Sequence, residues 1–137
     1  MKILLTGSTG YIGKRLLQQL LEQGHEVICM VRNLERLMSG EPALNNFIGV
    51  EIDLLNPVPE SAITNDFDVA FFLIHSMSTS IREFMKEEAR SAGNFADFIK
   101  RSNCKQIIYL SGISNSEKLS KHLQSRKNVE DILRNSG

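Results

Sequence analysis

The chain has 137 residues, with 16 basic and 16 acidic side chains that give a formal net charge of zero. This length fits one domain with a single core, and the balanced charge gives no support to nucleic acid or a membrane surface as a partner. The apolar run after Lys2 is too short for a signal peptide, and no run approaches the ~20 residues of a membrane span. We therefore expect a cytoplasmic protein.

The chain contains two cysteines, Cys29 and Cys104, which lie far apart in the sequence. Cys29 falls inside an apolar run, which favours a free, buried thiol, although a single disulfide between the two residues stays open. No metal site is predicted.

Three glycines spaced three residues apart separate the first predicted strand, residues 3–5, from the first predicted helix, residues 11–23. The first glycine predicts a tight turn, the second allows a pyrophosphate to approach the backbone, and the third allows the helix to pack close to the sheet. The first amides of a helix have no partner within it, and they attract an anion. Hydroxyl groups in the turn are candidates for helix capping or phosphate binding. The predicted phosphate-binding residues are Gly7, Ser8, Thr9, Gly10, Tyr11, Ile12 and Gly13, with the hydroxyl of Thr6 beside them.

Strands and helices are expected to alternate along the rest of the chain. The apolar face predicted for the first helix consists of Ile12, Leu16, Leu17, Leu20 and Leu21, and Gly24 is expected to end that helix. Further strands are predicted over residues 26–31, 47–52, 69–74 and 106–110, and further helices over residues 34–38, 79–102 and 119–135.

This alternation predicts parallel strands joined by right-handed crossovers. The expected fold is α/β: a Rossmann-like, doubly wound parallel sheet of strand order 3-2-1-4-5 with helices on both faces. Residues 69–74 are expected to form the central strand. A ligand should lie at the carboxyl ends of strands 1 and 4, where the winding of the sheet reverses.

The residues after the second strand bear on the choice between NAD and NADP. Val31 stands where an NAD-selective fold usually places a carboxylate, and Arg32 and Asn33 follow it. A guanidinium can hold the extra phosphate of NADP through two hydrogen bonds. NADP is therefore favoured over NAD, with a plain surface arginine as the alternative interpretation of Arg32.

Further candidates follow the third and fourth strands. Asp53 could accept a hydrogen bond from the adenine amino group while Leu54 packs on the ring, or it could be a plain turn aspartate. His75 and Ser76 are expected to face the pyrophosphate and the ribose of the nicotinamide. His75 has the chemistry of a general base, although a histidine at a strand end is more often a structural hydrogen-bonding group.

These motifs resemble those of the extended and atypical short-chain dehydrogenase/reductases. Residues 6–13 match the Thr-Gly-x-x-Gly-x-x-Gly loop of that family. Segments 31–33, 75–77, 109–112 and 122–126 are similar to an atypical NAD(P)H-binding subgroup often labelled nucleoside-diphosphate-sugar epimerase-like. The resemblance implies that residues 1–137 are an NADP(H)-binding Rossmann domain of an oxidoreductase or epimerase-like protein.

The resemblance also implies a catalytic group, from which this sequence departs. Active members use a tyrosine and a lysine four residues apart, and here that spacing holds His122 and Arg126. Ser111 fits the family's serine, so the catalytic candidates are Ser111, His122 and Arg126. An arginine stays charged and a histidine needs a different proton cycle. Family members also continue into a sixth strand and a substrate-covering part, which these 137 residues do not include.

Two functions remain open. The first is an NADP(H)-binding domain that serves chemistry on an unknown small-molecule substrate, and the second is a non-catalytic dinucleotide-binding sensor or scaffold module. A flavodoxin-like or response-regulator-like domain of the same strand order is disfavoured, because it would not need Gly7, Gly10 and Gly13 together. Homo-oligomerisation is left open.

Overall fold

The computed structural model describes residues 1–39, 46–74, 80–110 and 121–135, except the side chains of residues 81 and 121–123. Strands and helices alternate along these residues. The strands are β1 (Lys2–Thr6), β2 (Glu26–Val31), β3 (Phe47–Glu51), β4 (Val69–Phe72) and β5 (Gln106–Tyr109). The helices are α1 (Tyr11–Glu22), α2 (Leu34–Met38), α3 (Ile81–Lys100) and α4 (Lys121–Arg134).

The strands form one parallel sheet in the order β3-β2-β1-β4-β5, which confirms the predicted winding. Leu4 of β1 pairs with Ile28 of β2 on one side and with Ala70 of β4 on the other. The middle strand is therefore β1, and the prediction that residues 69–74 are the central strand was wrong. The winding reverses between β1 and β4, and this is the switch point at which such sheets bind ligands.

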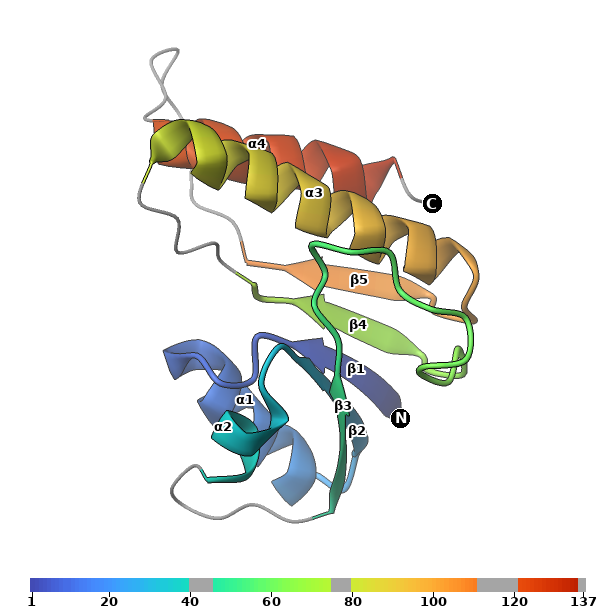
Figure 1. Cartoon of the computed structure of the whole chain (residues 1–137). Helices are drawn as coiled ribbons and strands as arrows, with labels where there is room; N and C mark the ends of the chain where they lie inside the picture. The colour runs from blue at the N-terminus through green and yellow to red at the C-terminus, as the bar shows by residue number, and fades with distance from the viewer. Residues whose placement is uncertain (40–45, 75–79, 111–120, 136–137) are drawn as a thin grey trace.

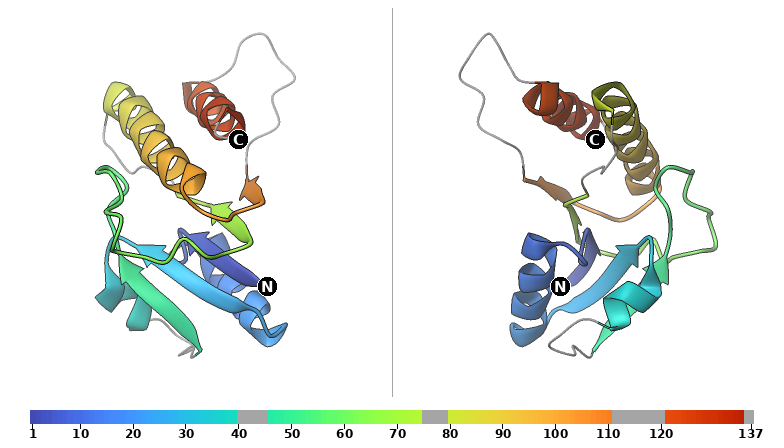
Figure 2. Two further views of the ribbon diagram at one scale, coloured as in Figure 1. Left: turned by 90° about the vertical axis from the view of Figure 1, so that its right-hand side faces the viewer. Right: turned by 60° about the vertical axis from the view of Figure 1, so that its left-hand side comes forward.

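Helices cover both faces of the sheet, as predicted (Figure 1). Helices α3 and α4 pack side by side on one face, where they bury a cluster that includes Leu4, Phe72 and Phe95 (Figure 2). Helix α1 lies on the other face with α2, over a second cluster that includes Leu5, Leu17 and Cys29. Alternate residues of β1 thus enter opposite cores, as expected for a strand covered on both faces.

Two details of the elements differ from the sequence prediction. β4 ends at Phe72, because the amide of the next residue, Leu73, donates to the side-chain hydroxyl of Thr6 in β1 at 3.2 Å and does not continue the backbone ladder. Ile12 was predicted on the buried face of α1, but it is 49% exposed. The first turn of α1 packs on the glycine turn through Gly13, so Ile12 points to solvent.

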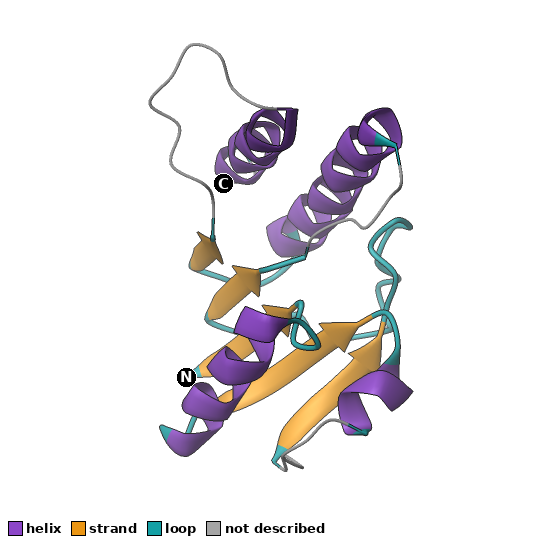
Figure 3. Ribbon diagram, turned by 90° about the vertical axis from the view of Figure 1, so that its left-hand side faces the viewer, coloured by secondary structure: helices purple, strands orange, loops and turns teal. Residues whose placement is uncertain are grey.

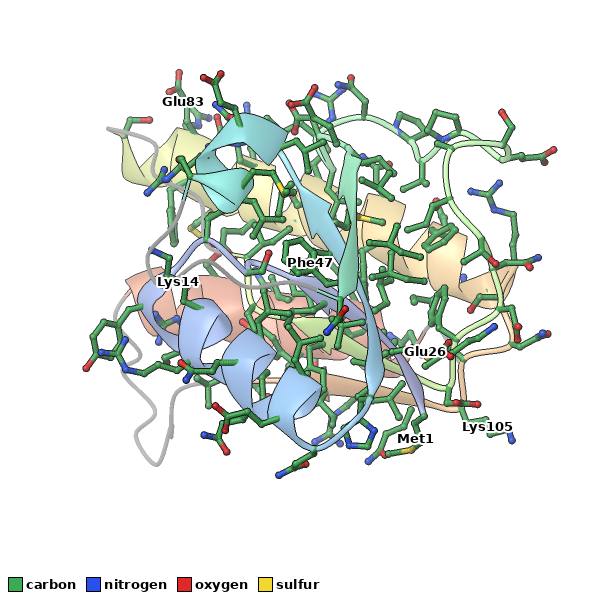
Figure 4. The ribbon with its side chains drawn as sticks, turned by 90° about the horizontal axis from the view of Figure 1, so that it is seen from below. Met1, Lys14, Glu26, Phe47, Glu83 and Lys105 are labelled. Atoms are coloured by element: carbon green, nitrogen blue, oxygen red, sulfur yellow. The ribbon has the colours of Figure 1, made fainter. Side chains whose placement is uncertain are left out.

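All five strands are parallel, so their carboxyl ends share one edge of the sheet (Figure 3). Helices α1 and α3 begin at that edge. Figure 4 shows Lys14 and Glu83, near the starts of these helices, away from Met1, Glu26 and Lys105 at the opposite edge. Among the described helices, none is both long and apolar enough to span a bilayer.

Candidate functional site

The glycine turn joins β1 to α1 at the switch point of the sheet. Gly7 has a φ of +75°, a left-handed conformation that glycine adopts without a Cβ penalty. A Cβ on Gly7 would also lie 2.6 Å from the carbonyl oxygen of Leu73, just beyond β4. The turn therefore presses against the carboxyl end of β4, and a side chain at this position would separate the two.

Gly13 is required by a second close approach within the same turn. A Cβ there would collide with the carbonyl oxygen of Gly7 and lie 2.9 Å from the Cα of Ser8. The expected close approach is present, but Gly13 meets the turn that follows β1, not the strands themselves. This contact sets the angle at which α1 leaves the sheet.

Gly10 differs from the other two glycines. It is the N-cap of α1 with an extended backbone, φ −79° and ψ 172°, which any residue adopts. Among the described residues, a Cβ on Gly10 would come within 4 Å only of the Gly7 carbonyl oxygen, at 3.4 Å. The described protein atoms therefore leave almost enough room for a side chain at position 10. A ligand that lies on the backbone at this position would explain why the residue is a glycine.

The first amides of α1 have no acceptor within the helix. Gly10 is the N-cap residue, and no side chain accepts a hydrogen bond from these amides as a cap. The first turn also carries no acidic residue that would compete with an anion. Tyr11 is 75% exposed, and the Arg15 guanidinium lies 3.6 Å from the centre of its ring. The turn thus presents open amides and a nearby cation, which is the arrangement that binds phosphate.

The hydroxyls of this turn have separate roles. Thr6 Oγ1 donates to the carbonyl of Phe71 at 2.8 Å and accepts from the amide of Leu73, so it joins β1 to β4 and is not available as a helix cap. Ser8 Oγ is buried and has no hydrogen-bond partner among the described residues. It lies close enough to Cys29 to lower the pKa of that thiol, although burial outweighs it and raises the pKa to about 11. Thr9 is half-buried.

Arg32 and Asn33 follow β2 at the same edge of the sheet, and both are exposed. The Asn33 side chain caps α2 by accepting a hydrogen bond from the amide of Arg36 at 3.0 Å. A second side chain also accepts a hydrogen bond from the start of α2. Glu51 Oε1, at the end of β3, accepts from the amide of Leu34 at 3.1 Å. Glu51 was not predicted as a site residue, although its charge near the end of the predicted strand over residues 47–52 was a usable signal.

Asp53 and Leu54 follow β3 and differ in their exposure. Asp53 is exposed, and its Oδ1 accepts from the amide of Leu55 at 3.0 Å within a turn. Leu54 is only 3% exposed and belongs to the core beneath α3. Its carbonyl accepts from Asn94 Nδ2 at 2.7 Å. The structure therefore leaves the Asp53 carboxylate accessible, while the Leu54 side chain serves the core.

The candidates after β4 and β5, His75, Ser76 and Ser111, lie outside the described residues. His122 lies in the first turn of α4, and its side chain is also outside the description. Arg126, one turn further along α4, is half-buried, and its Nε is buried without a hydrogen-bond partner among the described residues.

Arg126 belongs to a polar cluster that the sequence analysis did not find. The hydroxyl of Tyr109, the last residue of β5, is likewise buried and unpartnered among the described residues. Burial raises the pKa of Tyr109 to about 12; the charges of Glu88 and Glu130 act in the same direction, and that of Arg126 opposes them. The structure thus brings Arg126 to the end of β5, beside buried groups from α3.

A cavity of about 640 Å³ lies between β5 and the last turns of α3 and α4, and its lining includes Tyr109 and Glu130 of this cluster. Lys105 and Gln106, at the start of β5, also contribute to its wall. It does not include the glycine turn or the end of β2. The cavity is therefore separate from the switch point of the sheet, where the candidate ligand site consists of the glycine turn and the start of α1.

Comparison with known proteins identifies a family over nearly the whole chain. Residues 7–137 match the NAD(P)H-binding family. The curated photosystem II assembly factor Ycf39 of Synechocystis is 42% identical over 36 residues, which cover 26% of this chain and 11% of that protein.

Solved structures share the fold at low sequence identity. A UDP-galactose 4-epimerase superposes with a TM-score of 0.75 and 18% identity, covering 96% of this chain and 50% of that one. A short-chain dehydrogenase/reductase superfamily protein of Agrobacterium tumefaciens, with bound NAD, has a TM-score of 0.74 and 16% identity over 98% of this chain and 44% of that one. The chain thus spans half or less of the length of these proteins. The chain belongs to the NAD(P)H-binding family, and it shares the Rossmann fold of these structures.

Proposed function

We propose that residues 1–137 bind NADP(H) in preference to NAD(H), as the cofactor domain of an atypical oxidoreductase or epimerase-like protein that lacks the usual Tyr-Lys pair. The observation that carries the proposal is the surface above Gly10, where the described protein atoms leave room for a side chain that the sequence does not supply. A pyrophosphate lying on the backbone at that point accounts for the missing Cβ.

The pyrophosphate is held by the turn between β1 and α1. The open amides at the start of α1 donate to its oxygens, and Gly7 and Gly13 keep the turn in the required shape. Ser8 and Thr9 belong to the same turn, and Tyr11 and Ile12 contribute their backbone amides. His75 and Ser76, which follow β4 in the sequence, are the residues proposed to complete the phosphate site.

The adenosine end lies across the tips of β2 and β3. Arg32 is exposed at the tip of β2 and binds the 2′-phosphate that distinguishes NADP from NAD. Asn33 positions Arg32 by capping the helix that follows it. The exposed carboxylate of Asp53 accepts from the adenine amino group, whereas the side chain of Leu54 is buried in the core and not presented to the adenine ring.

Ser111, His122 and Arg126 are the residues proposed to act on the substrate. When bound, the nicotinamide supplies or accepts a hydride. Arg126 binds and orients a hydroxyl or an oxyanion through its N–H donors, because a guanidinium is a hydrogen-bond donor and not a proton-transfer group. Any proton transfer falls to His122 or Ser111, which differs from the tyrosine chemistry of the family. The substrate is a small molecule whose structure these residues do not define.

Thermal unfolding with each dinucleotide tests the cofactor preference. A ligand at a hundred times its dissociation constant stabilises the folded state by about 2.7 kcal/mol, which raises Tm by roughly 5–10 °C for a domain of this size. We expect a larger rise with NADPH than with NADH. Arg32→Ala should remove the difference, and Arg90→Ala, an exposed arginine on α3, should preserve it. Equal shifts with both dinucleotides in the wild-type protein would contradict the preference.

A second candidate function is a non-catalytic dinucleotide-binding sensor or scaffold. It is favoured by the departure from the Tyr-Lys pair and by the local similarity to a protein named as an assembly factor. Turnover of carbonyl substrates with NADPH separates the two functions. Turnover that is lost in His122→Ala supports the enzyme, whereas cofactor binding without turnover over a broad set of carbonyl compounds supports the sensor.

A further inference from the structure

Glu51 occupies a position next to the proposed adenosine site that the sequence analysis did not assign. It is the last residue of β3, it is exposed, and it pairs in register with Val31, the last residue of β2. Its Oε1 accepts a hydrogen bond from the backbone amide of Leu34 at 3.1 Å. A carboxylate therefore lies across the tip of β2, although position 31 itself carries an apolar side chain.

The backbone holds this carboxylate in place. The amide of Ile52 donates to the carbonyl of Val31 at 2.8 Å, which fixes the end of β3 against the end of β2. Between Val31 and Leu34 the chain contains only Arg32 and Asn33. The Glu51 carboxylate, bound to Leu34, must therefore lie close to the short turn from which the Arg32 side chain departs.

The two side chains have opposite effects on a phosphate at this turn. A phosphate monoester carries about −1.5 to −2 charge at neutral pH, so a cation attracts it and a carboxylate repels it. The 2′-hydroxyl of NAD carries no charge and can donate a hydrogen bond to a carboxylate. Glu51 thus favours NAD(H), as an acidic residue at the end of β2 would.

We propose that Glu51 is a specificity-determining residue that opposes Arg32 and limits the preference for NADP(H) over NAD(H). This inference rests on the proposed function, because it requires the adenosine ribose to lie at the tip of β2. The selectivity of the domain is then set by a pair of opposed charges on adjacent strands, and the wild-type preference for NADP(H) is modest.

Glu51→Gln tests this role with little change in structure. Glutamine keeps a side-chain oxygen that can accept the amide of Leu34, so the contact with α2 remains while the charge is lost. Dissociation constants for NADPH and NADH are measured from the change in nucleotide fluorescence, and circular dichroism checks the fold. Displacement by 2′,5′-ADP and by ADP isolates the adenosine end.

We expect the ratio of the NADH to the NADPH dissociation constant to rise about two- to five-fold, with a smaller rise at high salt because the groups are exposed. The ratio of ADP to 2′,5′-ADP affinity should change in the same direction. Glu26→Gln is the matched control, because it removes the same charge at the opposite end of β2 (Figure 4). This control should leave both ratios unchanged.

Two results would overturn the role of Glu51. One is an unchanged cofactor ratio in a folded Glu51→Gln protein, and the other is an equal rise in Glu26→Gln. Both differ from a failure of the proposed function, which would show as no binding of either dinucleotide to the wild-type protein.

Discussion

Gly10 and Gly13 lie three residues apart in one turn, but the structure gives them different reasons to lack a side chain. At Gly13 the reason is internal, because a Cβ would collide with the backbone of Gly7. At Gly10 a Cβ would come no nearer than 3.4 Å to a described protein atom, so the reason lies outside the described chain. Under the proposed function, the same glycine spacing combines a folding requirement at Gly13 with a binding requirement at Gly10.

Gly10→Ala and Gly13→Ala should therefore have opposite phenotypes. We expect Gly10→Ala to change the free energy of unfolding by less than about 1 kcal/mol and to weaken dinucleotide binding, because the new methyl group occupies the phosphate position. Gly13→Ala should lower the free energy of unfolding by more than about 2 kcal/mol, since backbone atoms must move. Urea unfolding and NADPH binding measure the two effects. A Gly10→Ala protein with unchanged affinity for NADPH would remove the support that this residue gives to the phosphate site.

Individual side-chain roles were harder to predict than the motif that contains them. The Thr6 hydroxyl was expected near the phosphate, yet it donates to the carbonyl of Phe71 and accepts from the amide of Leu73, both at the end of β4. Glu51 was not predicted at all. Its role depends on the pairing of β3 with β2, a contact between residues far apart in the sequence. A pattern of neighbouring residues in the sequence does not predict contacts of this kind.

Strand β2 shows how complete burial affects the ionisation of a cysteine thiol. This strand lies between β1 and β3, and Cys29 at its centre is fully buried in the cluster beneath α1. Loss of water from around the thiol raises the pKa of Cys29 from 9.0 to about 11. Cys29 is a free thiol, as expected, and so is Cys104.

The stability of the domain should fall at alkaline pH because of this strand. Below pH 9 the Cys29 thiol is protonated in both states, whereas between pH 9 and 11 only the unfolded chain loses the proton, so rising pH favours unfolding. We expect Cys29 to contribute a loss of about 2 kcal/mol over this range. Urea unfolding at several pH values should show a smaller loss for Cys29→Ala. Cys104→Ala, at a more exposed thiol, should change the pH dependence less. Equal slopes for wild type and Cys29→Ala would contradict the assignment.

The order of elements was predictable because apolar runs of strand length alternate with amphipathic segments of helix length. The bounds of β2 and α2 agree with the prediction, and α3 is two residues shorter at each end. The short α2 shows why local pattern was sufficient there, since the Asn33 cap is encoded next to the helix. β4 was predicted too long because its end is set by Thr6, a residue of another strand.

For the whole molecule, the order β3-β2-β1-β4-β5 brings together segments that are distant in the sequence. The glycine turn, the tip of β2 and the tip of β3 lie along one edge of the sheet, where a dinucleotide can extend across them. The chain spans about half of the UDP-galactose 4-epimerase it superposes on. Under the proposed function, the described residues include the side chains of Arg32 and Asp53 at the adenosine end, whereas Arg126 is the one substrate candidate with a described side chain.

A dinucleotide pyrophosphate is proposed to bind on the backbone above Gly10. The most direct test is an NADPH titration of the ¹⁵N-labelled protein, followed through its backbone amide resonances. We expect the largest shifts at the amides of residues 8–13, with a second group at residues 32–34 that is weaker with NADH. Shifts confined to the cavity beside β5, or no shifts in the glycine turn at saturating NADPH, would contradict the proposed binding.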